Sequence, residues 1–268
     1  MQRLFLLVFL GLLFSAHDLF LKTDRYFLSP GERSELFLFN GTFDESENVI
    51  SRDRMADSRI VGPGYRFVPA DEDWYDENEA TFLRCRFGKA GTYAAGVSTH
   101  ARQIELSAAD FNAYLEHDGV LDILERRKAQ GRLDEPATES YAKHVKAFLQ
   151  VGDERTKHYA AVFNYPLEFV PLDNPYAAAV GDQLSFRLLR SGEPVAGQLV
   201  YFNHRSSGQT TSGHHHDEAS ARTDANGECS FKVDHAGIWY LRTIHMVESD
   251  NEALDYLSNW ATLTFAVR

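Results

Sequence analysis

The sequence predicts a mainly β protein made of two β-sandwich modules, immunoglobulin-like or transthyretin-like, with a helical insertion in or after the first module. Turn residues such as those at 29–31, 192–194 and 224–227 recur between short alternating segments, as they do in sandwiches. Aromatic residues form 13% of the chain, and their rings pack well on a half-buried pleated surface. Only the stretch 107–149 changes to helical spacing of its apolar residues.

The first 16 residues have the features of a secretory signal peptide. A positive charge within the first three residues precedes an apolar run over 4–14, and residues 15–16 are small. A membrane-spanning helix needs about 20 apolar residues, so we expect cleavage after Ala16 and no membrane span in the mature chain. The mature protein would then begin at His17 and reside in the periplasm or outside the cell.

The composition excludes several functions. With 27 Lys and Arg against 39 Asp and Glu, the net charge is −12, which is unlike a nucleic-acid binder. The motifs G-x-S-x-G, H-E-x-x-H and C-x-x-C are absent, and the carboxylates are scattered through loops, so we expect no enzyme. Cys85 and Cys229 exclude a disulfide scaffold and a multi-cysteine metal cluster, and leave open either one bridge or two thiols.

An N-terminal domain is expected over residues 17–172. Aromatic and aliphatic runs at 35–39, 82–87 and 92–97 predict strands, because turn residues bound them. The acidic segment 44–80 between them is expected to be irregular.

The helical insertion is expected to contain two helices. Ser107 can cap the first, whose apolar side carries Phe111, Tyr114 and Leu115, and helical spacing resumes over 120–124. Pro136 can open the second. Its apolar residues recur at i, i+4, i+7 and i+8: Tyr141, Val145, Phe148 and Leu149.

A C-terminal immunoglobulin-like domain is expected over residues 173–268. Asn174 and Pro175 indicate its boundary, and glycine-containing turns divide the rest into short segments. The strands are predicted at 183–190, 198–204, 228–233, 238–246 and 260–267.

Histidine is the residue type that suggests chemistry, and His17 has a special position. An N-terminal histidine offers its α-amine and its ring Nδ1 to one metal ion. The amine has a pKa of about 7.7–8.0, so a metal can displace its proton near neutral pH. Such a nitrogen pair suits Ni, Co, Cu or Zn rather than Mg or Ca.

A histidine-rich loop is the second candidate. His214, His215 and His216 lie among Gly, Ser and Thr residues and precede two carboxylates, a composition that can capture a transition metal. Three neighbours cannot all face one ion in an extended strand, so this loop would collect metal rather than enclose it. The alternative is a polar hairpin loop without a ligand.

His204 and His245 complete the candidate metal ligands. His204 ends the strand that leads into the histidine-rich loop, and His245 lies at the end of the strand predicted at 238–246. For each, the alternative is a purely structural histidine.

Several stretches, taken in order, resemble a bacterial secreted family of unknown function. This family was once labelled the NikM-like subunit of a nickel transport complex, and is also described as a periplasmic component of cobalt transport. The resemblance rests on residues 16–21, 103–106, 111–116, 141–143, 149–152, 167–172, 174–176, 223–227, 237–239, 244–246 and 258–265.

The resemblance implies an exported, immunoglobulin-like protein associated with nickel or cobalt. His17 and His245 fall on positions that match the family pattern, whereas His204 and residues 214–216 are features of this sequence. The first hypothesis is therefore a periplasmic protein that delivers a metal ion to a membrane transporter. The alternatives are a non-catalytic envelope interaction protein, which would bind an envelope protein or a polysaccharide, and a copper-dependent oxidative enzyme.

Overall fold

The computed structural model describes residues 17–205 and 218–268, and it confirms the mainly β fold class. One long sheet runs through the molecule, with the order β16-β15-β18-β19-β11-β9-β5-β6, and β2 and β10 also pair with β11. Its strands are β2 (Phe27–Leu28), β5 (Met55–Gly62), β6 (Tyr65–Phe67), β9 (Gly91–Thr99), β10 (Arg102–Leu106), β11 (Ala137–Val151), β15 (Leu199–Arg205), β16 (Ala219–Arg222), β18 (Gly237–Glu248) and β19 (Tyr256–Val267).

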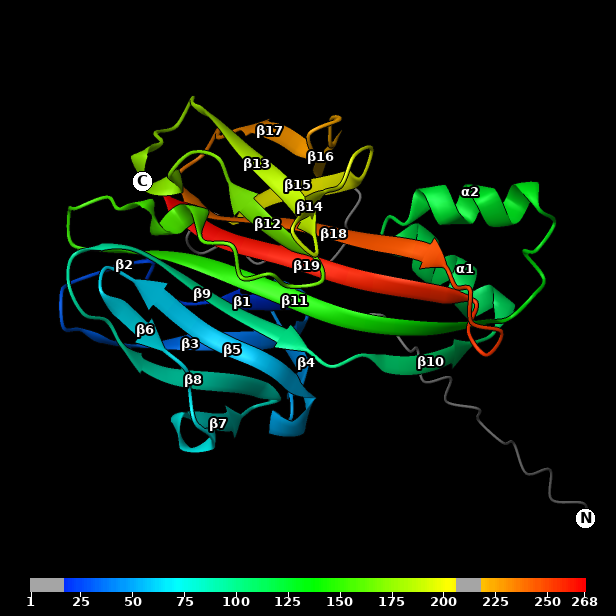
Figure 1. The fold of residues 1–268 in the computed structure, drawn as a ribbon, viewed down its shortest axis with the longest axis horizontal. Helices are drawn as coiled ribbons and strands as arrows, with labels where there is room; N and C mark the ends of the chain where they lie inside the picture. The colour runs from blue at the N-terminus through cyan, green and yellow to red at the C-terminus, as the bar shows by residue number, and fades with distance from the viewer. Residues whose placement is uncertain (1–16, 206–217) are drawn as a thin grey trace, which may run out of the picture.

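Two smaller sheets cover opposite sides of this central sheet (Figure 1). The N-terminal one contains β1 (Asp18–Lys22), β3 (Arg33–Gly41), β4 (Ser46–Asn48), β7 (Trp74–Glu77) and β8 (Ala80–Arg86). The C-terminal one contains β12 (Glu168–Pro171), β13 (Gln183–Arg190), β14 (Glu193–Pro194) and β17 (Glu228–Lys232). Within the described ranges, four short 3-10 helices lie between strands: η1 (Arg52–Arg54), η2 (Asp71–Asp73), η3 (Lys157–Ala160) and η4 (Pro175–Ala177).

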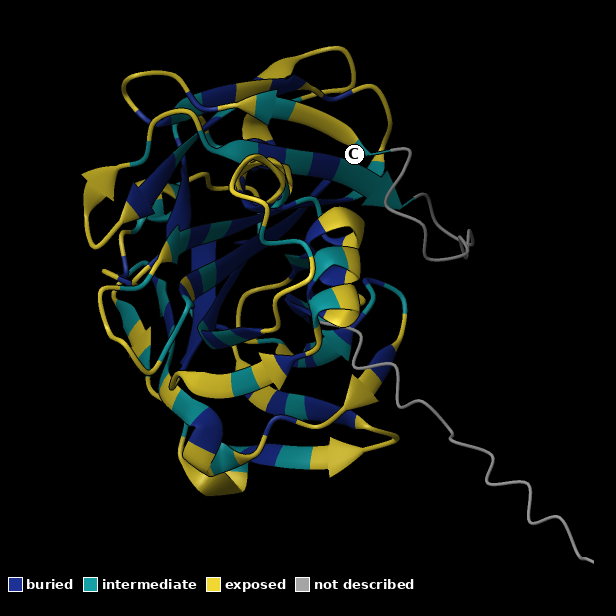
Figure 2. Ribbon diagram, turned by 90° about the vertical axis from the view of Figure 1, so that its right-hand side faces the viewer, coloured by how far each residue is buried: buried dark blue, intermediate teal, exposed yellow. Residues whose placement is uncertain are grey.

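Each small sheet forms a sandwich with its part of the central sheet. In the N-terminal sandwich, Leu36 and Leu83 belong to the same buried cluster as Tyr93 of β9. In the C-terminal sandwich, the rings of Phe186 and Phe265 are 5.7 Å apart across the two layers. Buried residues lie on the inner strands, whereas the outer faces are exposed (Figure 2). The two sandwiches therefore share one sheet.

Strand β11 joins the two sandwiches and corrects one prediction. It pairs antiparallel with β9 and parallel with β19, so the helix predicted after Pro136 is wrong. Every residue from Ala142 to Val151 is buried, because both faces of the strand are covered. A strand buried on both faces loses its simple alternation and can imitate helical spacing over a short run.

The segment 44–80 also differs from the prediction, since it holds β4, β5, β6 and β7 rather than irregular chain. The remaining strand predictions agree with the structure to within a few residues at their ends. Cys85 and Cys229 are buried free thiols in different sheets, so the disulfide alternative is wrong.

Helices α1 (Ala108–His117) and α2 (Leu121–Ala129) lie at one end of the molecule (Figure 1). As predicted, Ser107 caps α1, and its Oγ accepts from the backbone N–H of Asp110 at 3.2 Å. The apolar sides of both helices pack on Ile244, Tyr256 and Trp260, which lie on β18 and β19. Neither of the described helices is long and apolar enough to cross a membrane.

Candidate functional site

A cavity of about 630 Å³ lies between η1, β10, α1 and β11, and we call it the central cavity. This volume falls within the usual range of small-molecule sites, about 300–1,000 Å³. Alternate residues of β11 face it, because successive side chains of a strand point to opposite sides. Its lining includes His17, Asn40, Glu47, Val49, Arg54, Arg102, Ile104, Tyr114, Glu139, Tyr141, Lys143 and Trp260.

Lys143 is one of two buried cations in the wall of the central cavity. Its Nζ donates to Asn40 Oδ1 at 2.9 Å and to the backbone oxygen of His17. Burial lowers the pKa of its ammonium to about 8, although the nearby carboxylate of Asp18 opposes this shift. The side chain therefore ties the N-terminal segment to β11 while its charge borders the cavity.

Arg54 is the second buried cation, and its hydrogen bonding is incomplete. It ends η1 with only 6% of its surface exposed, and its Nε has no hydrogen-bond partner among the described residues. Its guanidinium lies 5.1 Å from the centre of the Tyr141 ring, and burial lowers its pKa. Buried polar groups normally have partners, so this N–H is an unusual feature of the wall.

Glu139 places a buried carboxyl group in the same wall. The hydroxyl of Tyr114 donates to its Oε1 at 3.2 Å, and the hydroxyl of Ser258 donates to the same oxygen. Burial raises the pKa of this carboxyl to about 7, while these hydrogen bonds act in the opposite direction. Glu139 is therefore partly protonated near neutral pH.

His17 lies at the rim of the central cavity. Its Nε2 is 3.0 Å from Glu47 Oε2, and burial lowers the pKa of its ring, with Glu47 opposing the shift. Residues 1–16 lie outside the described part of the chain, so signal cleavage and chelation through the α-amine both stay predictions.

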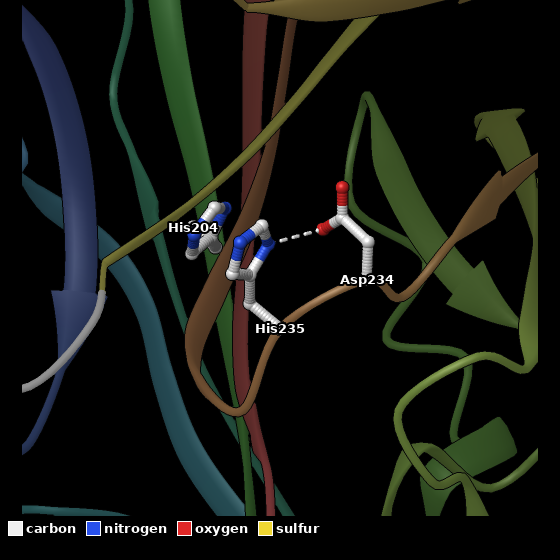
Figure 3. Close-up of side chains that lie close together, drawn as sticks. All are labelled: His204, Asp234 and His235. Carbon is white, nitrogen blue, oxygen red and sulfur yellow. Dashed lines mark hydrogen bonds and ion pairs between the residues drawn. The ribbon is translucent and has the colours of Figure 1, made fainter.

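The structure brings His204 together with two residues that the sequence analysis did not select. His204, Asp234 and His235 each place one potential ligand atom within 4.8 Å of the others (Figure 3). The two imidazole rings stack with centroids 4.2 Å apart, and His235 Nδ1 is 2.6 Å from Asp234 Oδ1. Burial, and then the neighbouring His235, lower the pKa of His204. Neutral imidazole is the form that binds a metal.

Strand pairing explains this cluster. His204 on β15 lies opposite Trp239 on β18, and the indole Nε1 of Trp239 donates to the backbone oxygen of His235 at 3.1 Å. The turn before β18 is thereby held against the end of β15. The sequence alone indicates a polar turn at Asp234-His235 but does not say which strand lies beside it.

The other predicted ligands lie apart from this cluster. His245 is on β18, opposite Asn259, and lines a separate cavity of about 240 Å³ beside the start of α2. His17 lines the central cavity instead, so His17 and His245 do not share a cavity. His214, His215 and His216 lie outside the described residues.

A family model described as a domain of unknown function, DUF4198, matches residues 14–247. The chain belongs to this family. The match covers most of the sequence, from the expected cleavage region into β18. The family description assigns no function to a DUF4198 protein, so the nickel and cobalt association stays a prediction. No curated protein matches this sequence.

Solved structures similar to this DUF4198 protein include the D0-D1 domain of intimin, at 10% identity, 92% coverage of this chain, 97% of that chain and a TM-score of 0.22. The Escherichia coli adhesin FdeC is 13% identical, and the match covers 92% of this chain and 65% of that chain with a TM-score of 0.23. Salmonella alpha-2-macroglobulin is 12% identical, and the match covers 94% of this chain and 15% of that chain with a TM-score of 0.23. At these TM-scores the similarities carry no functional inference.

Proposed function

We propose that this DUF4198 protein is a non-catalytic binding protein of the cell envelope, and that its ligand occupies the central cavity. The observation that supports this proposal is Arg54, a buried cation whose Nε has no described partner and whose side chain lines the cavity. A buried N–H without a partner costs about 1–3 kcal/mol. An anionic ligand in the cavity, beside the same guanidinium, would offset part of this cost.

The test is a thermal unfolding screen of the exported protein against small organic acids, amines and sugars. We expect at least one compound to raise the melting temperature in a saturable way, because a ligand that binds only the folded state stabilises it. The stabilisation should disappear in Arg54→Met and persist in Arg84→Met, which changes an exposed arginine on β8. Stabilisation that is unaffected by Arg54→Met would contradict the proposal.

The cluster of His204, Asp234 and His235 supports a second candidate function, metal binding. Imidazole nitrogens and a carboxylate oxygen suit nickel, cobalt, copper or zinc. The stacked rings must turn before one nitrogen from each faces the same ion, and with Asp234 and His235 exposed the ion would stay accessible. Such an open site suits delivery of an ion to a membrane transporter, as the family resemblance suggests.

Calorimetric titration with Ni²⁺, Co²⁺, Cu²⁺ and Zn²⁺ tests this second function. We expect His235→Ala to weaken binding at least tenfold, and His100→Ala, an exposed histidine outside the cluster, to leave it unchanged. Binding should also weaken below about pH 6, where imidazole takes up a proton. If His17→Ala abolishes binding and His235→Ala does not, the N-terminal chelate is the better assignment.

A further inference from the structure

The buried wall of the central cavity is positively charged although the whole chain carries −12. Glu47 and Arg102 are exposed residues of the lining and carry opposite charges. The deeper wall then holds Arg54 and Lys143 against Glu139, and all three are buried. With Glu139 ionised this group carries about one net positive charge, and with Glu139 protonated about two.

The two cations lie beside the same ring. The guanidinium carbon of Arg54 is 5.1 Å from the Tyr141 ring centre, and Lys143 Nζ is 5.8 Å from it. One oxyanion placed near this ring can therefore interact with both charges. Arg54 offers a planar donor group, and its Nε–H has no described partner. A guanidinium matches the flat, two-oxygen geometry of a carboxylate.

Another part of the wall is apolar and flat. Tyr114 and Trp260 stack with their ring centroids 5.8 Å apart and an interplanar angle of 6°. Ile104 also lines the cavity, and Val49, at 43% exposure, is an uncovered apolar residue in its lining. Aromatic walls of this kind favour ring or hydrocarbon groups, which bury apolar surface against them.

We propose that the central cavity binds a small organic monocarboxylate with a flat apolar body, that Arg54 and Lys143 hold its carboxylate, and that Tyr114 and Trp260 contact its body. This inference rests on the proposed binding function and names its ligand class. One negative charge matches the net charge of the wall when Glu139 is ionised. A doubly charged phosphate would leave a net negative charge in a buried site, which is costly.

The experiment uses three probes of similar shape: phenylacetate, phenylacetamide and phenyl phosphate. Saturation-transfer NMR and calorimetry of the full exported chain measure their binding at pH 7.5, between the pKa values of Glu139 and Lys143. We expect phenylacetate to bind at least tenfold more tightly than phenylacetamide, which lacks the charge, and more tightly than phenyl phosphate.

Two substitutions with opposite expected effects locate the site. Arg54→Met should weaken phenylacetate binding at least tenfold, and the exposed Arg84→Met serves as its control. Glu139→Gln should strengthen binding about threefold or more at pH 7.5, because it removes the competing carboxylate and keeps an oxygen for Tyr114 and Ser258. Far-UV circular dichroism shows whether Arg54→Met folds. If it does not fold, the phenylacetate affinity of Glu139→Gln tests the proposed site.

The outcomes separate the inference from the proposed function. Equal affinity for phenylacetate and phenylacetamide, or no gain in Glu139→Gln, overturns the carboxylate inference and leaves a binding cavity. Tighter binding of phenyl phosphate moves the ligand class to phosphate esters. If none of the three probes binds in a saturable way and the broader screen also finds no ligand, the inference and the proposed function both fail.

Discussion

Two groups of buried cations differ in how completely their charges are partnered. At one end of the molecule, Arg127 is fully buried, and its guanidinium donates to Asn112, to Tyr256 and to two backbone oxygens. On β11, Lys146 Nζ donates to Glu168 at 2.9 Å and to two more backbone oxygens. These cations hold the fold together.

The buried cations in the wall of the central cavity have fewer partners. Arg54 keeps an unpartnered Nε, and Lys143 has two oxygen partners but no carboxylate within ion-pair distance among the described residues. Lys143 and Lys146 are only three residues apart on one strand and lie on opposite faces of it. Burial alone therefore does not identify a binding residue, whereas incomplete partnering beside a cavity does.

The largest expected effect comes from the fully partnered group. Arg127→Met should lower the free energy of unfolding by about 4 kcal/mol, because four hydrogen bonds from a charged donor are lost. Arg54→Met should raise it by about 1 kcal/mol in the absence of ligand, since it removes a poorly partnered buried charge. Urea unfolding monitored by circular dichroism measures the free energy of unfolding of both variants. Equal decreases in the two variants would contradict the proposed difference between the two arginines.

The buried ion pair on β11 gives the next effect. Glu168→Gln should lower the free energy of unfolding by about 3–4 kcal/mol, because it leaves the buried charge of Lys146 without its carboxylate partner. Adding Lys146→Met to this variant should recover part of the loss, since the unpaired charge is then removed. Urea unfolding curves of the single and double variants measure this recovery of stability. A double variant that is less stable than Glu168→Gln would contradict the prediction.

Glu139 should make stability depend on pH. Its pKa is about 7 in the folded protein and 4.5 when unperturbed, so the folded state binds the extra proton between these values. The free energy of unfolding should therefore fall by up to about 3 kcal/mol as the pH rises through this interval. Glu139→Gln should remove that part of the slope in urea titrations between pH 4.5 and 8. An unchanged slope would mean that Glu139 titrates normally.

The smallest effect is expected at the rim. His17→Ala should change the free energy of unfolding by less than about 1 kcal/mol, because its partner Glu47 is half-exposed and becomes solvated. Thermal unfolding of this variant beside wild type measures the change. A loss comparable to that of Glu168→Gln would place His17 among the structural residues instead.

The fold class and most strands could be predicted from turns and apolar runs, but β11 could not. Its buried run, from Val145 to Leu149, fits helical spacing, and only its pairing with β9 and β19 decides the structure. Had it been treated as a strand, the alternation of Glu139, Tyr141 and Lys143 would have placed three polar or aromatic residues on one face.

The candidate sites depend on contacts between distant segments, which a single sequence does not specify. Arg54 is one arginine in an acidic stretch, and nothing local indicates that it is buried. His235 is one residue of a polar turn until β15 and β18 pair and bring it to His204. The histidines at 214–216 are predicted as metal ligands from composition alone.

The contact between the two ends of the chain affects when the protein can fold. Thr262 donates its hydroxyl proton to the backbone oxygen of Leu19 at 2.6 Å, across 243 positions of sequence, and Thr264 does the same for Leu21. Folds dominated by such distant contacts form slowly, since long loops must close first. A chain still emerging from a ribosome or a membrane pore lacks β19, the partner of both β11 and β18. Closure of the shared sheet therefore has to wait until the last residues have arrived, and a chain that stops short of β19 cannot complete it.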